Sequence, residues 1–189
     1  MTKVRLEIDS ITIHRPKKRW QIYFVVIADH PTEDNKMIVT TLPQGPIKLS
    51  PFNNNLYHFD TSQEGAEGLF LMSRKMPKSR ELNVHLYVRH SRSKQRDLYE
   101  VLKNVETGLT GETFGMITNV VGTAAVPWLV ISKKAISMIG NVLSKINDRD
   151  LGFISAFERF GPEFEDQTEI DREKPGSDCT IVYSWSVED

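Results

Sequence analysis

The sequence predicts a mainly β protein: an antiparallel β-sandwich of seven to eight strands with an inserted α-helical hairpin. Short segments in which apolar and polar residues alternate recur along the chain, as expected of half-buried strands. Turn-forming residues separate them, and the strand–helix–strand alternation that builds parallel sheets is not seen. With 189 residues, 39% of them hydrophobic, the chain has the size of one domain with a large insertion.

The first predicted strand covers residues 4–13, with a slip in its alternation near Ser10. The next segments with strand character are 20–28, 37–42, 56–59, 82–88, 152–160 and 179–187. Residues 43–51 contain three prolines, which predicts an irregular connection. Residues 69–72 are apolar but too short to assign, and the acidic run 163–173 predicts a solvated loop.

Residues 92–146 predict a helical insertion between two parts of the sandwich, residues 1–91 and 147–189. Apolar residues at 98, 101, 102 and 105 have the spacing of one helix face. A second apolar face follows at 129, 136, 139, 143 and 146. Pro127 fits the first turn of this second helix, so two helices are expected rather than one long span.

The insertion contains a stretch of 20 residues without formal charge, 113–132, between Glu112 and Lys133. Its length matches the roughly 20 residues that cross a hydrocarbon core, but several polar residues and Pro127 interrupt it. Its small residues would let another backbone approach closely, in lipid or in a protein core. A buried hairpin, a membrane-contacting segment and an oligomer contact therefore all remain open.

The overall net charge of −1 hides an asymmetry along the chain. Residues 1–146 carry 20 Lys and Arg against 13 Asp and Glu, whereas residues 147–189 carry 4 against 12. Cys179 is the only cysteine, so no disulfide framework is expected. The N-terminus lacks the apolar core of a signal peptide, which predicts a cytoplasmic protein; peripheral membrane attachment and secretion without a cleavable signal stay open.

No catalytic or cofactor motif is found. The five histidines lack the close spacing of metal ligands, and Cys179 opens an apolar strand, as a core residue does. Aromatic residues are not interleaved with the basic clusters, so no nucleic acid is expected as a partner. The sequence thus predicts a non-enzymatic protein without a metal or cofactor.

The order of the strands resembles that of C2 domains. Residues 4–11 (VRLEIDSI) fit the opening strand L-x-V-x-I-x-x-A of that family, and residues 19–25 (RWQIYFV) fit the strand D-P-Y-V-x-V. Residues 82–91 (LNVHLYVRHS) fit the later strand L-x-V-x-V-x-D-x-D, and residues 148–152 (DRDLG) fit D-D-x-I-G. The resemblance covers roughly residues 3–91 and 148–187.

The chain departs from this family where calcium would bind. Calcium needs six to eight oxygen ligands, which C2 domains supply with aspartates on their apical loops. The matching positions hold Lys17, Lys18 and Arg19 in the first loop and Arg89, His90 and Ser91 in the third. The resemblance therefore implies a calcium-independent member, of the kind that binds anionic headgroups or another protein.

The function predicted from these features is docking on an anionic membrane surface or a protein partner, through basic loops and the apolar hairpin. A hairpin released by a trigger would also fit a membrane-attacking or toxin-like protein. The alternative is a structural subunit of a homo- or hetero-oligomer, with the hairpin as the subunit contact. The predicted binding residues are Arg15, Lys17, Lys18, Arg19, Arg89, Arg92, Phe114, Met116, Ile117, Val120, Val121, Trp128, Leu129, Lys133 and Lys134.

Overall fold

The structure is a computed structural model. It describes residues 2–15, 19–49, 54–59, 69–93, 97–121, 124–166 and 169–188. At residues 119–121 and 124–125 it describes the backbone alone.

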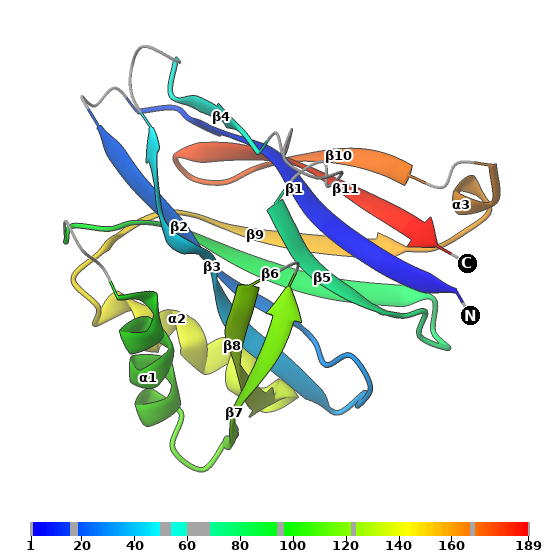
Figure 1. The fold of residues 1–189 in the computed structure, drawn as a ribbon, viewed down its shortest axis with the longest axis horizontal. Helices are drawn as coiled ribbons and strands as arrows, with labels where there is room; N and C mark the ends of the chain where they lie inside the picture. Colours follow the sequence, from blue (N-terminus) through cyan, green and yellow to red (C-terminus); the bar gives the residue numbers. More distant parts are fainter. Residues whose placement is uncertain are drawn as a thin grey trace.

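Two antiparallel sheets make up most of the described chain (Figure 1). One sheet has the order β10 (Glu169–Pro175), β11 (Cys179–Glu188), β1 (Lys3–Ile13) and β4 (Leu56–His58), with β5 (Leu69–Lys75) also paired to β1. The other has the order β7 (Thr113–Val121), β8 (Ala124–Ser132), β3 (Lys36–Leu49), β2 (Trp20–Asp29), β6 (Glu81–His90) and β9 (Arg149–Arg159). The mainly β, sandwich-like fold class is confirmed, with eleven described strands instead of seven or eight.

The sandwich core lies between the two sheets. Alternate residues of β1 point into it, and the pairing of β1 with β11 shifts between Ile8 and Ser10, where the sequence alternation slips. Trp20, Trp128 and Trp185 are all buried in this core. Cys179, which is a free cysteine, is also buried in it, as predicted.

A second core lies on the outer face of the six-stranded sheet. Helices α1 (Leu98–Gly108) and α2 (Ile136–Ser144) cover this face and bury Tyr23, Val25 and Ile27 of β2 beneath them (Figure 1). Two short helical segments, η2 (Lys133–Ala135) and α3 (Glu163–Asp166), complete the described helices. The six-stranded sheet is therefore covered on both faces near its middle.

The start of α1 follows from local chemistry. Asp97 is the N-cap residue, and its side chain accepts a hydrogen bond from the Tyr99 N–H at 2.9 Å. The apolar residues predicted for this helix, such as Val101 and Val105, are buried against the sheet. Within the predicted helical insertion, residues 98–108 are therefore helical.

The predicted helical hairpin is wrong for residues 113–132, which form the strands β7 and β8 instead. Nine of these 20 residues are Thr, Ile or Val, whose branched side chains favour strands. In β8, Val126 and Trp128 face the sandwich core while Leu129 and Ile131 face the helices. A strand that is buried on both faces lacks polar alternation, so its pattern cannot be told from that of a buried helix.

Pro127 lies within β8 and not in the first turn of a helix. The pairing of β8 with β3 extends from Ser132 to Leu129 and stops before Pro127. The missing N–H is therefore not needed for that ladder. The Pro127 carbonyl accepts a hydrogen bond from the Thr40 hydroxyl at 3.0 Å, which links the two strands where their pairing has ended.

Two further segments differ from the prediction. The proline-containing segment 43–49 continues β3 instead of forming an irregular connection. The acidic run 163–173 forms α3 and most of β10 instead of a loop. The charged composition of β10 does not indicate a strand. β10 is an edge strand, and it forms through its pairing with β11.

Candidate functional site

The strand β7 forms one edge of the six-stranded sheet. In the described part of the chain it pairs with β8 and with no other strand, so the opposite side of its backbone is unpaired. We call this unpaired side of Thr113–Val121 the open edge of β7. None of its nine residues carries a charge. Backbone N–H and C=O groups on such an edge are available to a further strand.

A bulge interrupts the open edge near its start. The pairing of β7 with β8 shifts between Thr113 and Gly115, and Gly115 has a φ of +93°. A Cβ at Gly115 would meet no atom within 4 Å, so the backbone conformation and not space accounts for the glycine. Regular pairing with β8 resumes at Gly115, opposite Val130.

Two apolar side chains of β7 are exposed. Phe114 is 59% exposed and Ile117 is 45% exposed, whereas Met116 packs partly against the helical core. The Lys36 ammonium lies 4.7 Å from the centre of the Phe114 ring, within cation–π range. The start of β7 thus combines apolar surface with a cation.

The other edge of the same sheet, β9, is contacted near both of its ends. Glu158 of β9 accepts two hydrogen bonds from the Arg172 guanidinium of β10, at 2.9 and 3.3 Å. The Leu151 carbonyl accepts one from the Asp178 N–H at 2.7 Å. These contacts tie both ends of β9 to the other sheet and partly obstruct its edge.

The edge strands of the other sheet, β10, β4 and β5, have other features that hinder the addition of a further strand. Five of the seven residues of β10 are charged, which disfavours the addition of a strand. β4 has only three residues, and β5 ends in Arg74 and Lys75. Among the described strands, β7 therefore combines an unpaired edge with a long uncharged sequence.

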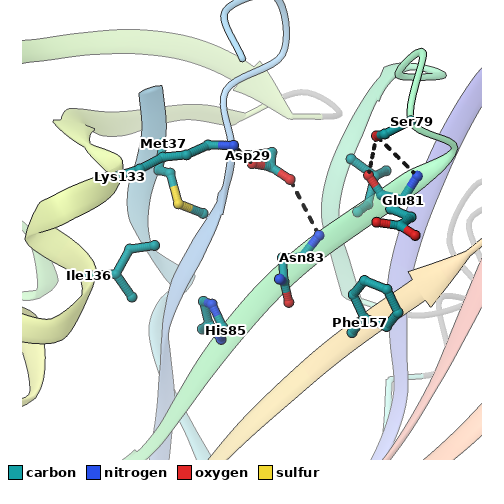
Figure 2. A pocket seen from close by; sticks show the side chains of 10 residues that line it. Asp29, Met37, Ser79, Glu81, Asn83, His85, Lys133, Ile136 and Phe157 are labelled. Carbon is teal, nitrogen blue, oxygen red and sulfur yellow. Dashed lines mark hydrogen bonds and ion pairs between the residues drawn. The ribbon is translucent and has the colours of Figure 1, made fainter. Parts of the chain in front are cut away.

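A pocket of about 250 Å³ lies on the outer face of the six-stranded sheet, beside α2 (Figure 2). Polar residues from several elements line it together with apolar ones. The lining consists of Asp29, Met37, Ser79, Glu81, Leu82, Asn83, His85, Lys133, Ile136 and Phe157.

The charges in this pocket are largely paired. The Asp29 carboxylate lies 3.2 Å from the Lys133 ammonium and accepts a hydrogen bond from the Asn83 N–H at 3.3 Å (Figure 2). His85 Nδ1 is buried and has no hydrogen-bond partner. Burial lowers the pKa of His85 below its ordinary value, against the opposing effect of Asp29. The lowered pKa favours the neutral imidazole, which is stacked 5.6 Å from the Phe153 ring.

The structure buries Arg89, one of the predicted binding residues. Its side chain is 0% exposed, and its guanidinium lies 2.9 Å from the Asp150 carboxylate. It also donates to the carbonyls of Ile146 and Asp148, at 3.4 and 3.0 Å. The predicted role of Arg89 at a membrane or partner surface does not fit this burial. The pairing of β6 with β9 shifts between Val88 and Arg89, and the Arg89 side chain is held by the connection before β9.

Trp128 and Leu129 are also inside the protein, at 4% and 0% exposed. They were predicted to insert into a membrane from a helix. In the strand β8, successive side chains point to opposite faces, and both faces here are covered. Neither residue can contact a membrane or a partner in this fold.

The remaining predicted binding residues that are described lie near the two ends of β2. Arg15 pairs with Asp178 at 2.5 Å, and the Arg92 side chain donates to Asn147 at 3.1 Å. Arg19 is exposed directly before β2, whereas Lys133 and the exposed Lys134 lie near Asp29 at its other end. Because β2 has ten residues, these ends are about 30 Å apart.

Arg15 and Arg19, which flank the basic first loop, are therefore not adjacent to the start of the hairpin. Lys17 and Lys18 lie outside the described residues, and the side chains of Val120 and Val121 are not described. Of the predicted residues, Phe114 and Ile117 are exposed on β7, and Lys133 and Lys134 are exposed directly after β8. Sequence reasoning missed the open edge itself, since the edge depends on the strand order and not on any residue type.

No three His, Cys, Asp or Glu side chains among the described residues are grouped so that they could hold a metal ion. None of the described helices has the length and apolarity needed to span a membrane.

Comparisons with known proteins provide no family for this chain. No family model matches it, and no curated protein matches it. Among solved structures, it is similar to the Drosophila C2-DSL-EGF1 structure with a TM-score of 0.38 and 8% identity, over 99% of this chain and 67% of that chain. A similarity at this level carries no argument about function, and the resemblance to C2 domains remains a prediction.

Proposed function

We propose that this chain is a non-enzymatic interaction module that binds a protein partner through the open edge of β7. The observation that carries the proposal is the contrast between β7, with nine uncharged residues, and the partly obstructed, charged or short edges elsewhere in the described chain. Proteins commonly blunt sheet edges against the addition of strands, and an edge without such protection is typical of a binding site.

The binding mode that fits this edge is the addition of a partner strand to the six-stranded sheet. Hydrogen bonds to the β7 backbone would supply affinity, and the exposed side chains of Phe114 and Ile117 would add apolar contact. This mode needs no sequence motif in β7, which agrees with the absence of one. In this binding mode the contact element is the β-hairpin formed by β7 and β8, and not the helical hairpin that the sequence predicts.

A strand peptide tests this proposal. The probe copies residues 124–132, the strand that β7 already accepts on its other side, and carries lysines and a fluorescent label at its ends. A peptide N-methylated at every second residue keeps one pairing edge and should bind. A peptide methylated at every residue has no pairing edge and should not bind. Equal binding of both peptides would contradict strand addition and indicate apolar adhesion.

A second candidate is an anionic membrane surface, and it is supported by Phe114 beside Lys36 with Lys133 and Lys134 exposed nearby. Each such cation contributes about 1 kcal/mol near an anionic surface at low salt. Co-sedimentation with vesicles of anionic or neutral lipid distinguishes it from the first candidate. Binding that requires anionic lipid, and that Phe114→Ser and Lys134→Glu abolish, would favour the membrane over a protein strand.

A further inference from the structure

The pocket beside α2 has the composition of a small-molecule site. Met37 and Ile136 lie on one side of it and Phe157 on the other, with Asn83 and His85 of β6 between them (Figure 2). Pockets that bind small ligands typically combine apolar walls with a few polar groups that fix the orientation of the ligand. The pocket shares no residue with β7, so an inference about it goes beyond the function proposed above.

The charged side chains that line this pocket have partners of opposite charge. The Asp29 carboxylate lies 3.2 Å from the Lys133 ammonium. Glu81 accepts two hydrogen bonds from the Arg159 guanidinium, at 2.9 and 2.5 Å. An ionic ligand would have to displace one of these partners before it could form an ion pair of its own. The pocket therefore favours an uncharged ligand.

Two polar side chains in the pocket keep hydrogen-bonding groups unused. Within the described chain, no residue forms a hydrogen bond with the His85 imidazole, and none accepts one from the Asn83 side-chain nitrogen. Both residues are half-buried, and they project from the same face of β6 because they are two residues apart. Polar groups that are partly shielded from water gain from a ligand that pairs with them.

The nitrogen of His85 that a ligand can reach is Nε2. Nδ1 is buried and has no hydrogen-bond partner among the residues that the structure describes, so a ligand cannot contact it. Burial lowers the pKa of the imidazole, which favours the neutral ring with a single N–H. A proton on Nε2 avoids a buried N–H group without an acceptor. His85 and Asn83 therefore both offer donors, which suit a carbonyl oxygen.

The Asp29 carboxylate adds an acceptor to the same pocket. One of its oxygens is paired with Lys133, and the other accepts the Asn83 backbone N–H. A carboxylate has about four lone-pair positions, so it can accept a further N–H group, and 12% of the Asp29 side chain is exposed. A ligand with a C=O and an N–H group therefore matches both kinds of partner.

The size of the pocket favours a ligand with a single ring. Its volume of about 250 Å³ lies below the roughly 300–1,000 Å³ that is typical of sites for drug-sized molecules. Phe157 is 49% exposed, and an aromatic ring placed against it would remove apolar surface of both rings from water.

We propose that this pocket binds a small, uncharged aromatic carboxamide. The amide oxygen accepts a hydrogen bond from His85 Nε2 or the Asn83 side chain, the amide N–H donates to Asp29, and the ring lies against Phe157. This ligand class uses the two unpaired donors and leaves the ion pairs of the lining intact.

Three probes of the same shape test the charge of the ligand. Benzamide is uncharged, benzoate is an anion and benzamidinium is a cation. Each is titrated into the isotopically labelled protein, and the backbone amide signals are followed by NMR. Benzamide should shift the signals of Asn83 and His85 in a saturable way in the millimolar range, whereas the two ions should bind at least about tenfold more weakly. Absence of saturable shifts with benzamide, or equal binding of an ion, would overturn the proposal.

Two substitutions on α2 test the location of the site. Ile136→Trp adds a large ring to the wall of the pocket and should abolish the benzamide shifts. Met138→Trp makes the same change at an exposed position of the helix outside the pocket and should leave them unchanged. Phe157→Ser, at a half-exposed position, should weaken binding several-fold without disturbing the core. Binding that survives both Ile136→Trp and Phe157→Ser would overturn this location.

The role of His85 has its own test. His85→Phe keeps a ring beside Phe153 but removes the Nε2 donor, and it should weaken benzamide binding about tenfold, the loss expected for one hydrogen bond. His58→Phe, at an exposed position of β4, is the matched control and should have no effect. Nitrogen NMR of the His85 imidazole should show its proton on Nε2. A proton on Nδ1, or unchanged binding by His85→Phe, would overturn the donor role of His85.

Discussion

Arg89 is the most deeply buried charge among the described residues that carry one. Its two carbonyl partners lie between α2 and β9, where the chain returns from the insertion to the sandwich, and its carboxylate partner Asp150 lies at the start of β9. The Ile146 and Asp148 carbonyls would lose their donor if the guanidinium were removed, and a buried unpaired carbonyl is costly. Arg89 thus fixes the position at which the helical layer rejoins the sheet.

Replacement of Arg89 by alanine should therefore lower the free energy of unfolding by about 3 kcal/mol. Urea unfolding followed by circular dichroism measures this loss. Asp150→Asn is the matched control, because the Asp150 carboxylate is 58% exposed and its removal should cost less than about 1 kcal/mol. Similar losses in the two variants would mean that the ion pair, and not the carbonyl contacts, is what Arg89 supplies.

Asp9 is a second residue whose environment has a measurable consequence. Burial raises the pKa of its carboxyl from 3.8 to about 6, and the neighbouring carboxylates of Asp171, Glu169 and Glu7 act in the same direction. The hydrogen bond from the Ser184 hydroxyl, at 3.2 Å, opposes this rise. The folded protein therefore binds more protons than the unfolded chain between about pH 4 and pH 6, so the contribution of Asp9 to stability falls as the pH rises through that range.

Asp9→Asn should accordingly stabilise the protein at pH 7 relative to the native chain, by about 1 kcal/mol after allowance for solvent screening. The gain should disappear near pH 4, where the native carboxyl is already largely protonated when folded. Urea unfolding at the two pH values gives the comparison. An equal effect at both would show that a lost contact, and not the carboxylate charge, determines the result.

At the scale of elements, the contact between α1 and α2 depends on one glycine. A Cβ on Gly108 would lie 2.6 Å from a Val142 methyl group, far closer than van der Waals contact. Gly108 ends α1, and Val142 is buried on the face of α2 that packs inward. The absence of a side chain therefore allows the two helices to meet.

Gly108→Ala should destabilise the protein by about 1–2 kcal/mol, even though alanine favours a helix by about 1 kcal/mol over glycine. Combination with Val142→Ala should restore part of this loss, because the second change removes the methyl groups that the new Cβ meets. A double-mutant cycle of unfolding free energies measures the coupling. Strictly additive effects would contradict the contact.

The elements that the sequence predicts best are strands with one covered face. β1, β6 and β9 alternate clearly, because their polar residues face solvent or the rim of the helical layer. β8 lies between two apolar layers and β10 is an edge strand with a charged face, so neither shows the expected pattern. The nine branched residues in 113–132 were the available signal for strands.

At the scale of the whole molecule, the candidate site was only partly predictable. The uncharged stretch was identified as the segment to explain, but its exposed residues, Phe114 and Ile117, could not be separated from the buried Trp128 and Leu129. Exposure along a hairpin depends on which strand lies at the edge and where its partner ends. Both are set by pairing between distant segments, which composition does not encode.

The strand β2 shows how the two layers constrain each other. Ile22, Phe24 and Val26 point into the sandwich core, while Tyr23, Val25 and Ile27 point under the helices. Since both sets are large and apolar, a slip of the strand by one residue would exchange two hydrophobic faces instead of placing one in water. The usual penalty against such a slip is therefore weak in β2.

Polar contacts at the ends of β2 favour its correct alignment, which the apolar pattern alone specifies only weakly. The Tyr23 hydroxyl donates to the Asp148 carboxylate at 2.8 Å, and the Gln21 N–H donates to His90 Nδ1 at 3.1 Å. Asp29 joins Lys133 and the Asn83 N–H at the opposite end. A chain that lost these contacts would keep its hydrophobic content and its sheet, but would no longer distinguish its correct alignment from the neighbouring one.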